Sequence, residues 1–295
     1  VATEPENIDA LILSCLGCPD PVAARWAMQQ LATRPVRDGA FDHAMSLAMH
    51  HSNLGVVLQA MRLRALHDAP GVEAMILDSL CSPYFSVRTL AAHLAAQRGI
   101  DVLQFWRDAM RDPTHPGARH ALASLAERAT PGDFERIAPW TGHPTAETRR
   151  HALTGLFNAD AEQSAPFLLH ALASKSVKEV RQALKLGQRV TRFHSRTNLV
   201  QAYRASPHVQ GRVQIMRAMC ALWPWDQLDA LLDCCGDSAH PHDAVLSSAL
   251  RLWQGAPIGK LDAARKATLR ERVARQRALV ATVDWDRIDA ILAAA

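Results

Sequence analysis

The chain of 295 residues is long enough for one large domain or two ordinary ones. Hydrophobic residues make up 48% of it, aromatic residues only 5% and charged residues 21%. This composition excludes a disordered or supercharged chain, and it favours helices packed through small side chains over a β-sandwich. The formal net charge of +4 is uneven, because residues 171–295 carry 19 Lys and Arg against 11 Asp and Glu. We therefore expect any acidic partner to bind the C-terminal half.

The start of the chain has acidic residues before a short apolar stretch, and it lacks the basic segment that opens a signal peptide. No apolar run reaches the roughly 18–20 residues of a membrane span. The six cysteines lack the spacing of a disulfide framework, which is typical of free thiols in a reducing compartment. We expect a cytoplasmic protein that does not insert into membranes.

Apolar residues recur with helical spacing in eight stretches, each predicted to be the first helix of a pair. In chain order these stretches lie at residues 8–17, 41–51, 72–81, 101–110, 134–140, 165–173, 197–205 and 225–235. Turns rich in Pro, Asp, Ser and His, such as DPTHP at 112–116 and HPTAE at 143–147, precede the second helices. A single pair cannot bury its apolar side, so the pairs are expected to stack into an α-solenoid.

The second helices share a register marked by arginine. Arg88, Arg119, Arg150, Arg181 and Arg212 follow one another at a constant interval of 31 residues. Apolar residues recur one position before and three and six positions after most of them, which places these slots on one side of a helix. With one residue of slippage, Arg25 joins the same column.

The pattern V-R-x-x-A-x-x-A-L after a turn with Asp or Pro resembles the HEAT repeat, in the short form shared with bilin-lyase-type HEAT repeats. The match is best at residues 85–99 and 177–189, and it covers roughly residues 8–255 as about eight repeats. The resemblance implies an all-α fold, a right-handed α-α superhelix. Residues 256–295 contain a long basic helix and a short final one, which we expect to form a C-terminal helical cap of the same domain.

The resemblance also implies a role for the arginine column. In HEAT-like repeats this arginine binds carboxylates or carbonyls in the turns of neighbouring repeats, and Asp20 and Asp112 would suit as acceptors. A structural ladder is therefore favoured over a ligand-binding row, because such repeats depend on interfaces between neighbours.

By the same resemblance, the second helices line the concave face, and their polar residues are candidate partner contacts. The candidates are His93, His120, Arg128, His151 and Arg217. His120 and His151 lie one repeat apart, either as a binding row or as two solvated residues, and the second reading is favoured.

The stretch 175–196 is strongly basic, with Glu179 as its one acid. Its candidate contacts are Lys185, Arg189, Arg192 and Arg196. Such a stripe suits an acidic protein patch, a phosphate backbone or a merely solvated face. Only Phe193 lies among these charges, which leaves little aromatic surface for stacking bases.

The sequence contains few motifs that would indicate a catalytic site or a metal site. Cys15 and Cys18 have C-x-x-C spacing without a second ligand pair, and no nucleophile–base set or phosphate loop stands out. Two HEAT-like families are catalysts, the alkylpurine DNA glycosylases and the bilin lyases, but neither set of active residues maps onto this chain. We expect no metal and no cofactor, and the balance favours a non-catalytic protein over an enzyme.

The sequence thus predicts a scaffold or adaptor that binds a protein or peptide carrying an acidic patch along the concave face of the solenoid. The alternative is nucleic-acid binding through a basic concave groove, including an enzyme similar to the alkylpurine DNA glycosylases. Continuous basic charge with exposed aromatic residues would distinguish that alternative.

Overall fold

The structure, a computed structural model, describes residues 5–34, 39–190, 193, 195–235, 244–253, 261–277 and 283–295. Within these ranges the secondary structure is helical throughout and contains no β-strand, which confirms the all-α prediction. None of the described helices is both long enough and apolar enough to cross a membrane. The chain divides into two compact units, residues 1–125 (unit 1) and 126–295 (unit 2).

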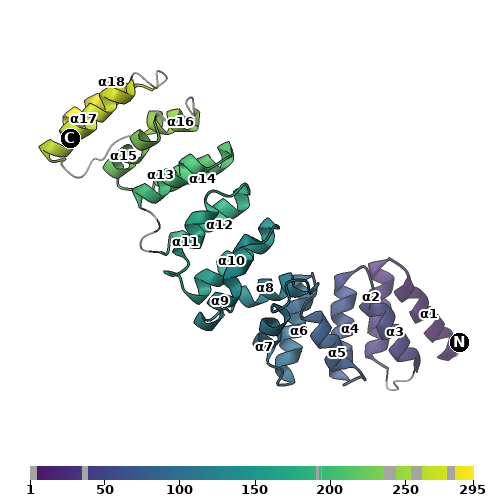
Figure 1. The fold of residues 1–295 in the computed structure, drawn as a ribbon. Helices are drawn as coiled ribbons and strands as arrows, with labels where there is room; N and C mark the ends of the chain where they lie inside the picture. The colour runs from purple at the N-terminus through teal and green to yellow at the C-terminus, as the bar shows by residue number, and fades with distance from the viewer. Residues whose placement is uncertain are drawn as a thin grey trace. The chain divides into compact units, whose positions relative to one another are not determined.

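Unit 1 is a stack of helix pairs. In order, the pairs are α1 (Pro5–Gly17) with α2 (Pro21–Ala32), α3 (Gly39–Met49) with α4 (Leu54–Leu66), α5 (Val72–Ser79) with α6 (Phe85–Gln97), and α7 (Val102–Ala109) with α8 (Ala118–Ala126). Helices at corresponding places in successive pairs lie side by side, α1 on α3, α2 on α4 and α4 on α6 (Figure 1). This packing of first on first and second on second helices is that of a solenoid.

Unit 2 continues the same pattern. Its pairs are α9 (Phe134–Ile137) with α10 (Ala146–Ala159), α11 (Ala165–Ala171) with α12 (Val177–Gly187), α13 (Arg196–Ala205) with α14 (Val209–Met219), α15 (Pro224–Cys234) with α16 (Ala244–Leu252), and α17 (Ala263–Arg277) with α18 (Trp285–Ala294). The second helices α10, α12, α14 and α16 pack in succession, and so do the first helices α11, α13, α15 and α17 (Figure 1). The described residues thus form eight pairs followed by α17 and α18, as predicted.

One predicted helix is broken. The stretch 134–140 folds as the single turn α9, flanked by the 3-10 helices η1 (Pro131–Asp133) and η2 (Ala138–Gly142). Pro139 lies at the start of η2 and has no backbone N–H to donate, so a regular α-helix cannot run through it. The first helix of this pair is short for that reason.

The predicted boundary between residues 255 and 256 falls in a stretch outside the described residues. On its C-terminal side, α17 packs against α15 and α18 packs against α17. Leu269, Val273 and Leu292 belong to the same buried apolar cluster as the other pairs of unit 2. The division into a solenoid and a cap stays a prediction.

Side chains at equivalent places on the second helices are buried in every repeat from α6 to α14. One such position on α6, α8, α10, α12 and α14 holds Ala91, Ala121, Ala152, Ala183 and Ile215, each essentially inaccessible. Small side chains at this slot let neighbouring helices approach closely. Many of the alanines of the chain therefore lie at the contacts between successive helix pairs.

Candidate functional site

A buried arginine ties each of several turns to its second helix. In α6, the Nη1 of Arg88 donates to the carbonyl oxygens of Ser82 and Pro83, at 2.8 and 3.1 Å. Its Nε donates to the Oγ of Ser124 at the end of α8, 3.0 Å away. One guanidinium thus satisfies two turn carbonyls that no helix bonds, and joins two successive repeats.

Arg149 makes the same contacts in α10. Its Nη1 donates to the carbonyl oxygens of His143 and Pro144, at 2.8 and 2.9 Å. Its Nε and Nη2 donate to both oxygens of the Glu179 carboxylate in α12, at 2.9 and 2.7 Å. The hydrogen bond from the guanidinium to Glu179 raises the pKa of Arg149 above its usual value. Ser174 donates a further hydrogen bond to Glu179.

The arginines of the predicted column therefore lie at two different positions on their helices, one buried and one facing outward. The buried register runs through residues 88, 118, 149, 180 and 212, where Arg88 and Arg212 are buried, Arg149 is mostly covered, and Ala118 and Val180 replace arginine. Arg212 donates to the carbonyl oxygen of Ser206 at 3.3 Å. Arg25, Arg119 and Arg181 are exposed and Arg150 is half-buried, so these four lie on the outer side of their helices.

The aspartates suggested as acceptors bind their own turns. Asp20 caps α2 by accepting from the backbone N–H of Val22 at 2.9 Å. Asp112 accepts from the backbone N–H and the hydroxyl of Thr114, and these hydrogen bonds, the hydroxyl first, lower the pKa of Asp112. Turn carbonyls, Ser124 and Glu179 receive the arginine hydrogen bonds described above.

The outer side of three second helices of unit 2, α12, α14 and α16, is basic. We define the basic face as the exposed cations of α12, α14 and α16, together with Arg189 directly after α12: Lys178, Arg181, Lys185, Arg189, Arg217 and Arg251. These three helices contain one carboxylate, Glu179, which is buried against Arg149. Every exposed charge on them is therefore positive. The three helices pack side by side, so the cations lie on adjoining elements.

Two side-chain contacts join the α12 part of the basic face to α10. The guanidinium of Arg189 lies 5.1 Å from the ring centroid of Phe157, a cation–π contact with α10. The Nε2 of Gln182 donates to the hydroxyl of Thr154 at 3.1 Å, which links α12 to α10. Lys185, between them on α12, is exposed.

The remaining predicted contacts are spread over both units. In unit 1, His93 is exposed with its Nε2 3.1 Å from the side-chain amide of Gln97, and His120 is half-buried. In unit 2, Arg128 is exposed and His151 is half-buried. Arg192 lies outside the described residues. Of the predicted set, Lys185, Arg189 and Arg217 come together on the basic face.

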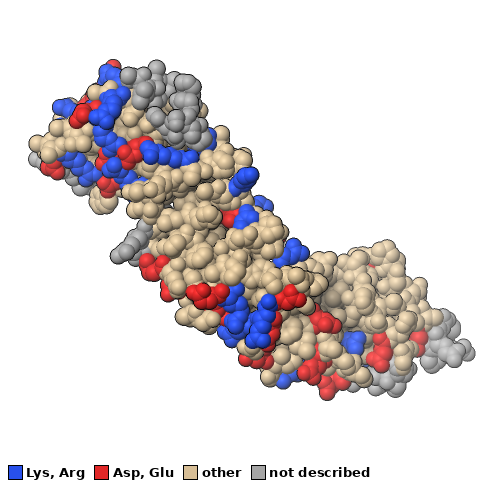
Figure 2. All heavy atoms as spheres, viewed as in Figure 1, with Lys and Arg blue, Asp and Glu red and all other residues tan. Residues whose placement is uncertain are grey.

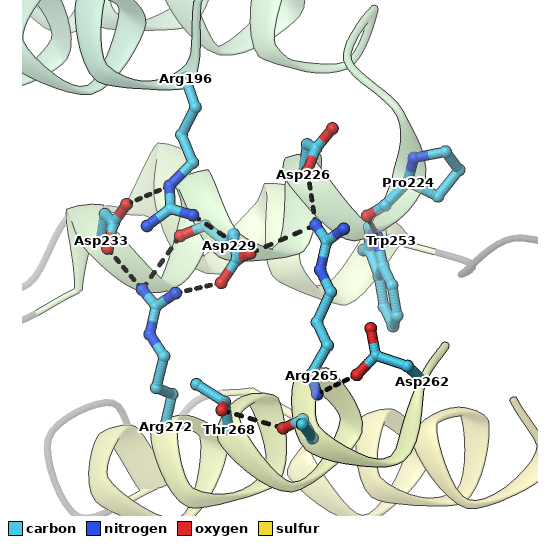
Figure 3. A network of polar contacts seen from close by, with 11 residues as sticks. Arg196, Pro224, Asp226, Asp229, Asp233, Trp253, Asp262, Arg265, Thr268 and Arg272 are labelled. Carbon is cyan, nitrogen blue, oxygen red and sulfur yellow. Dashed lines mark hydrogen bonds and ion pairs between the residues drawn. The ribbon is translucent and has the colours of Figure 1, made fainter. Parts of the chain in front are cut away.

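Arg196, predicted as a partner contact, is held inside a network of charges (Figure 3). Its guanidinium lies 2.7 Å from Asp233 and 3.2 Å from Asp229 on α15. Arg272 of α17 contacts the same two carboxylates. Asp229 and Asp233 are four residues apart, so both carboxylates lie on one side of α15 and bridge α13 to α17.

The network extends along α15 to Asp226, which pairs with Arg265 of α17 (Figure 3). The hydrogen bond from Arg265 to Asp226 raises the pKa of the guanidinium. At the end of α17, Arg277 pairs with Asp286 and Asp289 of α18. In Figure 2, blue and red side chains are interleaved over α15, α17 and α18. Much of the positive charge of the C-terminal half is thus balanced internally, whereas the basic face has no exposed carboxylate.

A groove opens between α14 and α16 beside the basic face. It has a volume of about 540 Å³ and a mostly apolar lining. Its lining includes Val213, Met216, Val245, Ala249 and Leu252, with Arg217, Cys220, Gln227 and Ser248 as polar members. Leu252 is 73% exposed. Hydrophobic spacing does not indicate this groove, because its walls come from two successive repeats that meet only through the packing of α14 on α16.

The cysteines form no disulfide. All six are free thiols, with Cys15 half-buried, Cys18 exposed, and Cys234 and Cys235 buried. Burial raises the pKa of Cys235 to about 12 and that of Cys81 to about 11. Within the described ranges, no three His, Cys, Asp or Glu side chains gather as metal ligands would.

Comparison with known proteins adds little. No family model and no curated protein matches the chain. Among solved structures, the chain is similar to human deoxyhypusine hydroxylase in complex with glycerol. The identity is 18%, the match covers 83% of this chain and 93% of that one, and the TM-score is 0.29. No residue role is transferred from that protein.

Proposed function

We propose that unit 2 binds an acidic protein or peptide on its basic face, and that the chain acts as a scaffold or adaptor. The observation that carries the proposal is the sign of the exposed charge. Every exposed charged side chain on α12, α14 and α16 is a cation, while the one carboxylate of these helices is buried in a pair with Arg149. An acidic partner would meet attraction from adjoining helices and repulsion from none of them.

The mechanism rests on a preformed surface. The helices of the face are fixed by packing and by contacts such as Arg189 on Phe157, so little backbone order is lost on binding. Surface ion pairs contribute only about 0–1 kcal/mol each, so affinity has to come from several cations acting together with apolar contacts. Such a surface favours fast association that weakens with salt.

Nucleic acid is the second candidate, because the same row of cations suits phosphates. Protein is favoured by what lies between the cations. The helices α12, α14 and α16 contain no Phe, Tyr or Trp, so they offer no stacking platform for bases. Their exposed neutral residues are Gln, Ser and aliphatic side chains.

We also propose that the repeats belong to the short HEAT-like class. The support is the motif at 177–189 and the buried register of the second helices, which places arginine, alanine or valine in the first turn of the helix. Three residues later it places alanine in four of the five helices and isoleucine in α14.

The test is a pull-down from native lysate, with and without nuclease, comparing two charge-reversed variants. Lys185→Glu with Arg189→Glu alters the basic face. Arg62→Glu with Arg270→Glu changes the net charge equally at exposed positions of α4 and α17. We expect a protein partner that resists nuclease, is lost with the first variant and is kept with the second.

Two outcomes would overturn the proposal. If the bound material is lost after nuclease treatment, the basic face binds nucleic acid. Equal retention by both variants would show that the partner binds elsewhere. Circular dichroism of each variant, compared with the parent protein, separates lost binding from lost fold.

A further inference from the structure

We infer that the groove between α14 and α16 receives the apolar side of an amphipathic helix whose other residues are acidic. This inference rests on the proposed function and adds to it a second contact of a different chemical kind. The basic face accounts for charge, and the groove would supply the apolar contacts that fix orientation and register. The occupant is thereby narrowed from any acidic protein to a helical segment.

The first argument is the lining of the groove. Six apolar side chains line it together with Arg217, Cys220, Gln227 and Ser248, and no carboxylate is among the lining residues. The volume of about 540 Å³ is within the range that buries a small ligand or a few side chains.

The second argument is charge. Arg217 lines the groove and also belongs to the basic face, so the two surfaces share a residue. Arg251 adjoins Leu252, the most exposed apolar residue of the lining, on the other wall. A segment lying in the groove would therefore meet Arg217 in its lining, and the helix of the other wall carries a second cation, Arg251. Acidic residues flanking its apolar side would pair with these cations.

The third argument is the shape of the two walls. Helices α14 and α16 pack side by side as the second members of successive pairs. The trough between two packed helices accepts the side-chain ridge of a third helix, with apolar anchors at i, i+3, i+4 and i+7. Trp223, 72% exposed, lies in the turn between Cys220 and Gln227, which both line the groove.

The lining argues against bases as occupants. It contains no aromatic side chain on which a nucleobase could stack. A second copy of this chain is disfavoured by charge, because an identical basic face would be brought close to the first. Both remain measurable outcomes of the test below.

The experiment is a selection with the full chain as bait and a displayed library of peptides about four helical turns long. We expect the selected peptides to be rich in Asp and Glu and to carry apolar residues at i, i+3 or i+4, and i+7. The best peptide, labelled for fluorescence anisotropy, is then compared with a shuffled peptide of identical composition. We expect at least roughly tenfold weaker binding of the shuffled peptide, the size of effect of one lost apolar anchor.

Two matched variants locate the peptide. Ser248→Trp fills the groove from an exposed position on α16, and Ser46→Trp makes the same change at an exposed position on α3. We expect Ser248→Trp to weaken binding at least roughly tenfold and Ser46→Trp to leave it unchanged. Sedimentation velocity on the same samples reports any self-association. A dimer that Ser248→Trp dissolves would make a second copy the occupant and overturn the inference.

The failure of this inference is distinguishable from that of the proposed function. If Lys185→Glu with Arg189→Glu abolishes binding but Ser248→Trp and shuffling do not, the basic face stands and the groove is excluded. If none of these changes matters, both are wrong. If Ser248→Trp weakens binding of the selected peptide and leaves binding of the shuffled peptide unchanged, the groove is the binding site of the selected peptide.

Discussion

Arg149 and Glu179 join two successive repeats through a two-pronged ion pair. The Nη2 of the arginine lies 2.7 Å from Oε2 of the glutamate, and the same guanidinium binds two turn carbonyls. The carboxylate is nearly inaccessible, with 5% of its side chain exposed. A pair this well covered acts as an interface between repeats, not as a solvated surface bridge.

Replacing Arg149 by methionine is expected to destabilise the chain by about 3 kcal/mol, because Glu179 would stay buried without its cation. Urea unfolding followed by circular dichroism measures the change. The control is Arg150→Met, the neighbouring residue on the outer side, which should shift the free energy of unfolding by less than about 0.5 kcal/mol. Equal effects at both positions would contradict the assignment of the buried register.

The neighbours Arg149 and Arg150 also show which features could be predicted from the sequence. The repetition, the helix pairs and their number follow from hydrophobic spacing and turn residues, and these predictions are confirmed. The arginine column was placed with a constant interval of 31, whereas the buried register runs 88, 118, 149, 180 and 212. A shift of one residue turns a side chain by about 100° around the helix, from the interface to the outside.

The sequence could not resolve that shift, because turn lengths between repeats vary freely at little energetic cost. Arginine also occurs at both positions, buried at Arg88 and exposed at Arg119, so residue type does not decide between them. The same limit applies to Arg196. Its charge was visible in the sequence, but its partners Asp229 and Asp233 are more than thirty residues away and meet it only through the stacking of α13 on α15.

Removing Arg272 is expected to loosen the C-terminal helices. Its side chain is 20% exposed and pairs with Asp229 and Asp233, which lie on one side of α15 and would lose one of the cations between them. Because Arg196 still pairs with both carboxylates, Arg272→Ala should cost about 1–3 kcal/mol and speed amide hydrogen exchange in α17 and α18 before the rest of unit 2. Arg270→Ala, an exposed change on the same helix, is the control and should leave exchange unchanged. Uniform acceleration along all of unit 2 would show instead that α17 is no separate contributor.

Gly187 is expected to tolerate no side chain. A Cβ built there would lie 2.1 Å from the nearest ring atom of the buried Phe193. Gly187→Ala should therefore lower the free energy of unfolding by about 1–3 kcal/mol, even though alanine is the better helix former. At Gly17 nothing lies within 4 Å, so Gly17→Ala should be neutral or slightly stabilising. Thermal unfolding of the two variants gives the comparison, and a stable Gly187→Ala protein would place Phe193 elsewhere.

The cysteines should separate by reactivity. Burial raises the pKa of Cys235 to about 12 and that of Cys81 to about 11, so their thiolate fractions near pH 8 are very small. Cys18 and Cys220 are both exposed, but desolvation raises the pKa of the Cys220 thiol. Native alkylation followed by mass spectrometry should therefore modify Cys18 first, and leave Cys81 and Cys235 intact until the chain unfolds. Early modification of Cys235 would contradict its burial.

The same two thiols predict how stability depends on alkaline pH. Their pKa values are raised in the folded chain above the ordinary value of 9.0, so the unfolded chain loses these protons first. Stability from the protonated thiols is complete below pH 9 and is lost as pH rises from 9 toward 11 and 12. Urea unfolding across this range, with Cys81→Ala and Cys235→Ala together as the control, should show a steeper decline in the parent protein. Parallel declines would mean that neither thiol is shielded from water in the folded chain.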